Sequence, residues 1–507
     1  MKWIKNNKLE FTAIILIAIL TLFLRFYKLD EYMTFLGDEG RDALVIKDIL
    51  VNFDIPLLGP STSVGNMYLG PLYYYMMAVP MAIFWLDPVA AAGMVALIGT
   101  LTVGLIYYLS REWFGKKAAV IAAVLYSVSP VTIIYSKSSW NPNPAPFFAL
   151  LSFLGLYKAH KTGDFAWFVL TGVSLAFAIQ MHYLALILIP IFGLLWLNEL
   201  RIYLKKKGSR QFFVGGTVGA ICFFLILMSP LVLFDLRHNL MNYRAITTFF
   251  ASPDKTVGFS LLNNLQSTIE IYQLKLIGRY MAGEIQILAF ALAIIILLPL
   301  GWVLYSGVKL KHNIKWQYLA LYSWILIGCF GLSFYHHEIY DHYLGFINPA
   351  PFLLLGASFF VLELNKNKTV RNLLQGLFLL MVVGLILVNL SNSPLLKSPN
   401  KQLKRTQEVA KFIIQESQNK PFNFALIAGH NYDAAYQFYL GEYGHKPGQL
   451  PFDQTEQLFV VCEDSECKPV GHAKYEIAAF GWTTSEWEKD VQGVKIYKLI
   501  PNPDQPR

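Results

Sequence analysis

Charged residues are scarce in this sequence. Only 15% of its 507 residues are Asp, Glu, Lys or Arg, whereas an average soluble domain carries about 25%. The mean hydropathy is +0.44 and 55% of the residues are hydrophobic. A single water-soluble core cannot absorb that much, because such cores stop growing at about 250 to 300 residues. The composition therefore predicts a membrane protein whose chain crosses the bilayer many times.

Cysteine is also scarce, with four residues in the whole chain. This excludes a disulfide-rich scaffold. Cys222 and Cys329 lie inside apolar runs without a neighbouring His or second Cys, so they predict no metal site. Only Cys462 and Cys467 are close enough in the sequence to pair. The pattern leaves open whether they form a disulfide or stay as two reduced thiols.

Ionisable residues are nearly absent from the apolar runs. Apart from Glu10 and Arg25, near the ends of the first run, no ionisable residue lies deep in any run. A charge-coupled transporter places acids or bases inside its spans, so this absence argues against one. The basic residues behind the net charge of +9 form short clusters between the runs. That arrangement is typical of membrane orientation and not of nucleic-acid binding.

Eleven apolar runs are long enough, or nearly so, to be transmembrane helices. The first follows three lysines and has no small-residue cleavage site after it, which predicts an uncleaved helix. The predicted spans are residues 9–27, 88–110, 117–135, 145–158, 166–181, 184–200, 212–234, 285–304, 317–334, 343–362 and 372–391.

The run at residues 71–86 is different, because it is short and contains Pro80 and three consecutive tyrosines. Such a segment could cross the membrane or lie in the interface. If it does not cross, the main basic clusters all lie on the side of the N-terminus. The positive-inside bias then predicts a cytoplasmic N-terminus, an extracytoplasmic C-terminus and a long first outer loop at residues 28–87.

The chain becomes polar from residue 392. Its periodicity predicts a helix at 401–417, a strand at 424–428, a helix at 434–440 and strands at 458–461 and 494–500. We therefore expect two domains, a transmembrane domain at 1–391 and a small extracytoplasmic α/β domain at 392–507.

The strongest chemical signal is Gly37-Asp38-Glu39-Gly40-Arg41-Asp42, about ten residues beyond the first predicted helix. An amphipathic pattern suited to the membrane interface follows as far as Leu50. In one interpretation, Asp38 and Glu39 only cap this helix. In the other, the carboxylates take a proton from an acceptor hydroxyl while Arg41 stabilises an anionic leaving group.

This motif, after one helix that follows a cytoplasmic N-terminus, resembles the GT-C membrane glycosyltransferases. It is most similar to glycosyltransferase family 39, which contains the protein O-mannosyltransferases and the lipid A aminoarabinose transferases. Pro71-Leu72-Tyr73-Tyr74 is similar to the family's juxtamembrane segment, and Phe114–Ala119 to its first cytoplasmic turn. The resemblance implies a polytopic helical GT-C fold with about eleven transmembrane helices and interfacial juxtamembrane helices.

The resemblance also implies roles for the motif residues. Asp38 matches the family's catalytic aspartate, Glu39 the acid beside it, and Arg41 a residue that holds the lipid phosphate. Tyr68-Leu69-Gly70 lacks the basic residue that the family often has before its paired prolines. Arg41 or Arg237 would then carry the phosphate charge.

The second outer loop, Ser136–Pro144, contains Asn141 and Asn143 where relatives often have another aspartate. Amides can hold sugar hydroxyls but cannot act as bases, so a second carboxylate role falls to Glu39 or is absent. Asn-Pro-Asn-Pro is equally typical of a turn before a helix. Trp140 could stack on a sugar or anchor the loop at the interface.

Four further residues of the outer loops are candidates for binding the sugar or the acceptor. His182 lies in a very short turn, and His238 opens a loop of about 50 residues. Both could equally be structural. His342 and Tyr343 resemble a family segment that opens onto the donor site.

The residues just before that segment raise the question of a metal. His336, His337 and Glu338 offer imidazole and carboxylate ligands that suit zinc or manganese. Their spacing is not a known zinc signature. We expect no firmly bound cofactor, with a divalent metal as the weaker alternative.

The resemblance implies a membrane enzyme that moves one hexose or pentose from a polyprenyl-phosphate carrier to an acceptor hydroxyl, with inversion and with Asp38 as the general base. The acceptor is a lipid, glycan or protein. The other partners are membrane lipids, and no nucleic acid is expected. The expected location is the cell membrane, with an extracytoplasmic active site. The alternatives are a GT-C transferase that uses a pyrophosphate carrier, or a lipid or glycan transporter.

Overall fold

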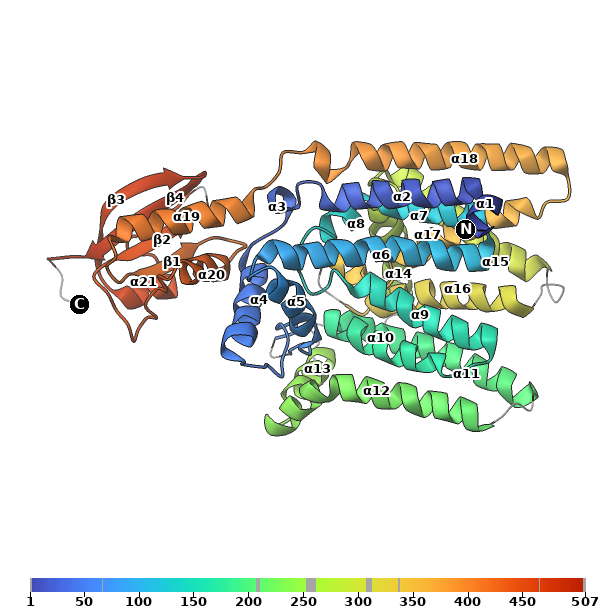
Figure 1. Ribbon diagram of the computed structural model, residues 1–507, viewed down its shortest axis with the longest axis horizontal. Coiled ribbons are helices and arrows are strands. Elements are labelled where there is room, and N and C mark those ends of the chain that lie inside the picture. Colours follow the sequence, from blue (N-terminus) through green and yellow to red (C-terminus); the bar gives the residue numbers. More distant parts are fainter. Residues whose placement is uncertain are drawn as a thin grey trace.

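The computed structural model describes residues 2–65, 67–206, 210–251, 261–306, 312–335, 338–464 and 466–504. Most of the chain forms a body of long helices, and the C-terminal part forms a smaller domain with a sheet (Figure 1). The C-terminal domain lies at one end of the helical body, on the same side as the segment that follows the first long helix, and the N-terminus lies at the opposite end.

Each of the eleven predicted spans contains a helix. Five of the helices in the described residues are long and apolar enough to cross a bilayer, and they begin at Lys8, Pro88, Tyr183, Gln211 and Lys368. The chain is thus a membrane protein, while eleven crossings and the orientation stay predictions. The helices that lie in the eleven predicted spans are α2 (Lys8–Phe26), α6 (Pro88–Phe114), α7 (Lys116–Val128), α8 (Pro130–Tyr135), α9 (Ala145–Thr162), α10 (Trp167–Met181), α11 (Leu188–Lys206), α12 (Arg210–Arg237), α15 (Gln286–Ser306), α16 (His312–Leu332), α17 (Pro349–Glu363) and α18 (Lys368–Ser391).

Two of the predicted spans are not continuous helices. The run at 117–135 is divided between α7 and α8 at Ser129, because Pro130 has no N–H and disfavours a helical conformation in the residue before it. The run at 343–362 begins as a short 3-10 turn, and α17 starts only at Pro349, where proline suits the first helical turn.

Helix α17 lies at the centre of the helical body. All residues from Pro349 to Phe359 are buried. Around it, the ring of Phe153 on α9 stacks on Trp324 of α16 at 4.0 Å between centroids. Helix α12, in contrast, presents its apolar side chains at the surface, and no residue in its most apolar stretch of 18 residues is buried. An apolar exterior of this kind is typical of a helix that faces lipid.

The segment between α2 and α6 contains only short helices. They are α3 (Leu29–Tyr32), α4 (Gly37–Lys47), a π-helical turn at Asp48–Asn52 and α5 (Leu72–Ile83). The 12 residues of α5 extend about 18 Å, which is less than the roughly 30 Å of a hydrocarbon core. This length agrees with the prediction that residues 71–86 do not cross the membrane.

The C-terminal domain contains α19 (Gln402–Ser417), α20 (Ala434–Glu442), α21 (Tyr475–Phe480) and a sheet of order β1-β2-β4-β3. Strands β1 (Asn423–Ile427) and β2 (Leu458–Cys462) are parallel, and β4 (Val494–Pro501) is antiparallel to β2 and to β3 (Thr483–Val491). The sequence analysis missed β3. This edge strand is mostly exposed and polar, so the hydrophobic pattern gives no signal for it.

The C-terminal domain packs against α4. Phe35, just before α4, lies edge-on to Phe438 and Tyr439 of α20. At the other end of α4, Lys47 Nζ forms an ion pair of 2.6 Å with Glu442. Gly40 lies so close to α20 that a Cβ there would be 2.2 Å from the backbone nitrogen of Ala435. The acidic motif on α4 therefore lies between the membrane helices and the C-terminal domain.

Candidate functional site

Helix α4 begins at the acidic motif, and Glu39 caps it. The Leu36 backbone N–H donates to Glu39 Oε2 at 3.1 Å, and Ser138 Oγ donates to Glu39 Oε1 at 2.8 Å. Burial raises the pKa of Glu39. This carboxyl thus joins the start of α4 to the second outer loop. For Glu39, the contacts agree with the interpretation in which the acid caps the helix.

Asp38 points away from that cap and is partly exposed. Its Oδ1 accepts a hydrogen bond from Arg41 Nη1 at 2.9 Å and another from the Tyr432 hydroxyl at 2.8 Å. Within the described part of the chain, Oδ2 accepts no hydrogen bond from the protein. One oxygen of Asp38 is therefore held by two donors and the other is available to a substrate.

Arg41 lies between two carboxylates. In addition to Asp38, it bonds Asp42 Oδ1 through Nε at 2.9 Å and Nη2 at 2.7 Å. Asp42 is fully buried, and burial raises its pKa to about 7 although Arg41 opposes the shift. A planar guanidinium held by two neighbours in this way is fixed in orientation, which suits it to bind an anionic group in one geometry.

A cavity of about 200 Å³ opens beside Asp38 and Arg41. Five further predicted residues line it, from three separate loops of the helical body. The sequence analysis did not predict six of its lining residues. The predicted residues are Asp38, Arg41, Trp140, Asn141, His182, His342 and Tyr343, and the others are Ser61, Thr62, Ser63, Leu69, Pro142 and Tyr183.

Aromatic rings form much of the cavity wall. The ring of Trp140 lies 4.4 Å from that of His342, and His342 lies 4.5 Å from Tyr343. Next to them, His182 lies 5.1 Å from Tyr343 and stacks on Tyr183 at 4.9 Å. Flat apolar faces with polar edges are suited to pack against a sugar ring while their polar atoms bond its hydroxyls.

Both histidines of the wall are neutral at pH 7. Burial lowers the pKa of His342 to about 4 and holds the pKa of His182 well below its usual range. Among the described residues that line the cavity, Arg41 is then the one positive charge. An anionic ligand in this cavity would bind through Arg41.

The hydroxyl-rich turn at residues 61–63 closes one side of the cavity. Ser63 Oγ lies 3.4 Å from the hydroxyl oxygens of both Tyr183 and Tyr343. A bridge between Ser61 and Tyr68 holds the turn in place. The sequence contains one indication of this part of the site, because Ser61-Thr62-Ser63 is a run of three hydroxyl residues in a predicted outer loop.

An apolar recess of about 100 Å³ adjoins the cavity at Tyr183. Its wall comes from the loop after residue 63, the 3-10 turn Tyr183–Ile187 before α11, helix α13 (Met241–Ala251) and the end of α16 with the residues that follow it. It could accommodate a hydrocarbon chain whose polar end lies in the cavity. The lining residues are Val64, Met67, Tyr183, Leu184, Leu186, Ile187, Ile246, Gly331, Phe334 and Tyr335.

Four predicted site residues do not line the cavity. Glu39 is buried in its capping role. Arg237 is exposed at the end of α12, and the exposed ring of His238 stacks on Phe234 at 4.0 Å. Asn143 Nδ2 donates to the Ser138 carbonyl at 2.8 Å, so this amide forms a hydrogen bond inside the second outer loop and stabilises its conformation.

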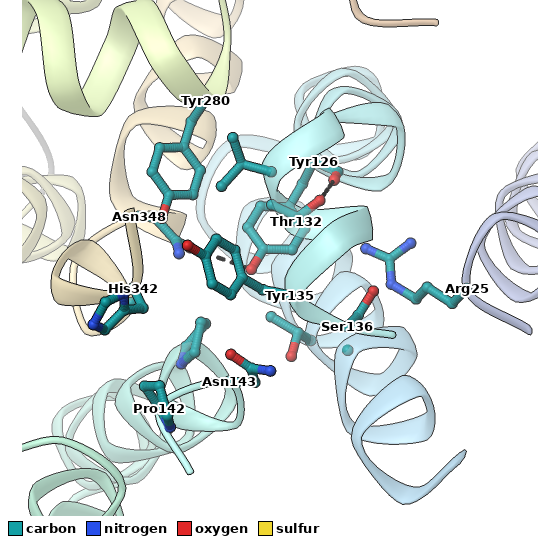
Figure 2. Close-up of a pocket in the computed structure, with 15 residues that line it drawn as sticks. Arg25, Tyr126, Thr132, Tyr135, Ser136, Pro142, Asn143, Tyr280, His342 and Asn348 are labelled. Atoms are coloured by element: carbon teal, nitrogen blue, oxygen red, sulfur yellow. Dashed lines mark hydrogen bonds between the residues drawn. The ribbon is translucent and has the colours of Figure 1, made fainter. Parts of the chain in front are cut away.

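Asn143 instead lines a second, smaller cavity inside the helical body, together with Arg25 (Figure 2). Arg25 reaches from α2 toward Ser136 and is fully buried, although the sequence placed it near a helix end. Its Nη1 donates to the Ser127 carbonyl at 3.3 Å. His342 and Pro142 line both cavities, so they form the partition between them.

The weaker alternative of a metal site falls mostly outside the described residues. Within the described residues, no group of three His, Cys, Asp or Glu side chains is arranged to hold an ion. His336 and His337 lie outside the described residues, and Glu338 lines a separate cleft of about 570 Å³ with Arg279 and Asp341. In the C-terminal domain, Cys462 and Cys467 form a disulfide.

Comparison with known proteins finds similarity in sequence over part of the chain. The sequence model of the family described as dolichyl-phosphate-mannose-protein mannosyltransferase matches residues 69–232. The Bacillus subtilis (strain 168) protein named "Putative mannosyltransferase YycA" is 29% identical over 139 residues, which are 27% of this chain and 19% of that protein. The match thus spans about a fifth of the relative's length.

Two solved structures share the fold over nearly the whole chain. ArnT from Cupriavidus metallidurans, bound to undecaprenyl phosphate, has a TM-score of 0.58 at 14% identity, with 96% of this chain and 97% of ArnT covered. The oligosaccharyltransferase AglB from Archaeoglobus fulgidus, in complex with an inhibitory peptide and dolichol-phosphate, has a TM-score of 0.51 at 15% identity, with 100% and 75% covered. The family model and the Bacillus relative are thus named as mannosyltransferases, and both structural neighbours were solved with a polyprenyl phosphate.

Proposed function

We propose that this chain is a membrane glycosyltransferase of the GT-C superfamily and transfers a single sugar from a polyprenyl-phosphate carrier to an acceptor hydroxyl. One observation carries the proposal. Asp38 and Arg41 lie together in a cavity that has an aromatic wall and an adjoining apolar recess. A base, a cation, a sugar-sized space and a place for a lipid chain are the four features that this reaction needs.

Asp38 is the general base in this mechanism. Its Oδ2 takes the proton of the acceptor hydroxyl as the hydroxyl oxygen attacks the anomeric carbon. The new glycosidic bond forms as the bond between that carbon and the phosphate oxygen breaks, and the electron pair leaves with the phosphate. A single displacement of this kind inverts the anomeric configuration.

Arg41 stabilises the departing phosphate. It is the positive charge of the cavity lining, and its contacts with Asp38 and Asp42 fix the plane of the guanidinium. Charge that develops on the leaving group is best stabilised by donors that are already oriented. The exposed Arg237 is not among the residues that line the cavity, so Arg41 carries this role.

The remaining lining residues hold the sugar and the lipid. Trp140 and His342 offer faces to the sugar ring, and the buried Asn141 lies beside them. The apolar recess takes the first units of the prenyl chain. The reaction takes place at the extracytoplasmic face of the cell membrane, on a hexose or pentose, and the acceptor is a lipid, glycan or protein.

The test is release of lipid phosphate in nanodiscs. Wild type, Asp38→Asn and the control Asp54→Asn, which changes an exposed acid of the same outer segment, receive labelled polyprenyl-phosphate hexoses and pentoses with membrane extracts as acceptors. We expect release of polyprenyl monophosphate by wild type and the control. We expect a loss of at least about a hundredfold in Asp38→Asn, because a positioned base contributes 10²–10⁴-fold.

Equal release by Asp38→Asn and wild type would remove Asp38 from the mechanism. If the folded protein binds these donors but consumes none of them, the transferase proposal itself is wrong. Release of lipid pyrophosphate from a pyrophosphate-linked donor would instead support the other class of GT-C transferase.

A further inference from the structure

The loop before α20 reaches into the catalytic motif. Asn431 Oδ1 accepts a hydrogen bond from the Gly37 backbone N–H at 2.8 Å, and Asn431 Nδ2 donates to Glu463 Oε2 at 2.9 Å. Glu463 is itself held by the Tyr436 hydroxyl at 2.7 Å. A chain of hydrogen bonds thus connects Glu463, the residue that follows β2 in the C-terminal domain, to the first residue of α4.

Tyr432, the next residue, covers the start of α4. A Cβ on Gly37 would lie 2.4 Å from the ring of Tyr432, so the glycine allows the ring to lie against the helix backbone. The hydroxyl of Tyr432 donates to Asp38 Oδ1 at 2.8 Å. Burial and the nearby carboxylates raise the pKa of Tyr432, so the phenol stays protonated at neutral pH and donates a hydrogen bond to the carboxylate.

The two donors to Asp38 come from different parts of the molecule. Arg41 is one helical turn away on α4, whereas Tyr432 is 394 residues away in sequence. Both bond the same oxygen, Oδ1. With this oxygen fixed from two directions, the carboxylate cannot rotate freely, and Oδ2 keeps one orientation.

We propose that Tyr432 is a positioning residue for Asp38, through which the C-terminal domain forms part of the active site. Tyr432 and Arg41 hold Oδ1, so that Oδ2 faces the acceptor hydroxyl. This inference rests on the proposed function. It follows that the transmembrane domain is fully active only with the C-terminal domain docked on α4.

The test compares Tyr432→Phe with wild type in the full-length protein in nanodiscs. The control is Tyr475→Phe, which changes an exposed tyrosine of the same domain. Loss of a hydrogen bond to a charged group should lower kcat about tenfold to a hundredfold. The KM for the lipid donor should change little, because Tyr432 does not line the cavity that holds the donor.

The pH profile separates positioning from a general structural effect. The Tyr432 hydrogen bond favours the ionised carboxylate, so its loss should move the acid limb of kcat/KM to higher pH by about one unit. The control should keep the wild-type limb. The titratable or charged groups around Asp38 are Glu39, Arg41, Asp42, His342 and Tyr432.

A double-mutant cycle on the thermal unfolding midpoint tests the contact without any activity. If the side chains interact, the decreases caused by Tyr432→Phe and Asp38→Asn should not add in the double variant. Non-additive midpoints with an inactive wild type would support the contact and reject the proposed function. An active wild type whose kcat and acid limb are unchanged in Tyr432→Phe would overturn the positioning role and leave the proposed function standing.

Discussion

The largely buried imidazole of His342 couples the stability of the protein to pH. Its pKa is lowered from 6.5 to about 4 by burial, so folding favours the neutral ring. The resulting stabilisation is fully present above pH 6.5 and is lost as the pH falls toward 4. For this one group it amounts to at most about 3 kcal/mol.

We therefore predict that His342→Gln flattens the pH dependence of thermal unfolding. The unfolding midpoint of wild type should decrease from pH 6.5 to pH 4 more steeply than that of the variant, because glutamine has no proton to gain. His430→Gln, which changes an exposed histidine, should follow wild type. Parallel curves for wild type and His342→Gln would contradict the assignment of a neutral buried ring.

At the scale of single residues, the sequence predicted which residues gather at the site better than it predicted the direction in which each side chain points. The spacing of Asp38 and Arg41, three residues apart on a helix, predicts their contact. The inward direction of Glu39 depends on Ser138 in a separate loop. The contact with Tyr432 joins the two domains, and no local pattern contains that information.

Among the elements, the contact of α4 with α20 depends on Gly40. A methyl group at this position would meet the backbone of Ala435 at 2.2 Å, and a backbone cannot move aside as a flexible side chain can. Gly40→Ala should therefore displace α20 and take Tyr432 away from Asp38. We expect at least a tenfold loss of kcat and faster proteolysis between the two domains.

Gly104→Ala is the matched control for this substitution. Gly104 lies within α6 and an added Cβ would meet nothing within 4 Å, so alanine should leave activity unchanged and favour the helix by roughly 0.5–1 kcal/mol. Normal kcat and normal proteolysis in Gly40→Ala would show that the domains do not need this close approach.

Hydrophobic runs predicted the position of most helices, because a buried or lipid-facing helix must be apolar over its length. They could not predict the division between α7 and α8, which Pro130 causes. Strand β3 was missed because its residues alternate weakly and face solvent. Its hairpin with β4 has the turn Gln492-Gly493, both at positive φ, a weaker signal than Asn-Gly.

On the scale of the whole molecule, α4, which carries Asp38 and Arg41, and the C-terminal domain share one end of the helical body, and the N-terminus lies at the other (Figure 1). The basic clusters predict that the N-terminal end is cytoplasmic. We expect a cysteine introduced by Ser485→Cys, in the exposed strand β3, to react with an impermeant maleimide in intact cells. Lys5→Cys should react only after the membrane is opened.

These variants are made in a Cys222→Ser background, because Cys222 is exposed on α12. The background protein without an added cysteine gives the control signal. Labelling of the Lys5→Cys protein in intact cells, with Ser485→Cys protected, would reverse the predicted orientation and place the cavity on the cytoplasmic side.

The anomeric configuration of the product tests the central claim most directly. A donor labelled with ¹³C at the anomeric carbon is converted by the wild-type protein, and the configuration of donor and product is read by NMR. A single displacement with Asp38 as base predicts complete inversion, with one lipid monophosphate released for each sugar transferred. Retention of configuration would require a covalent intermediate or a second displacement and would contradict this account.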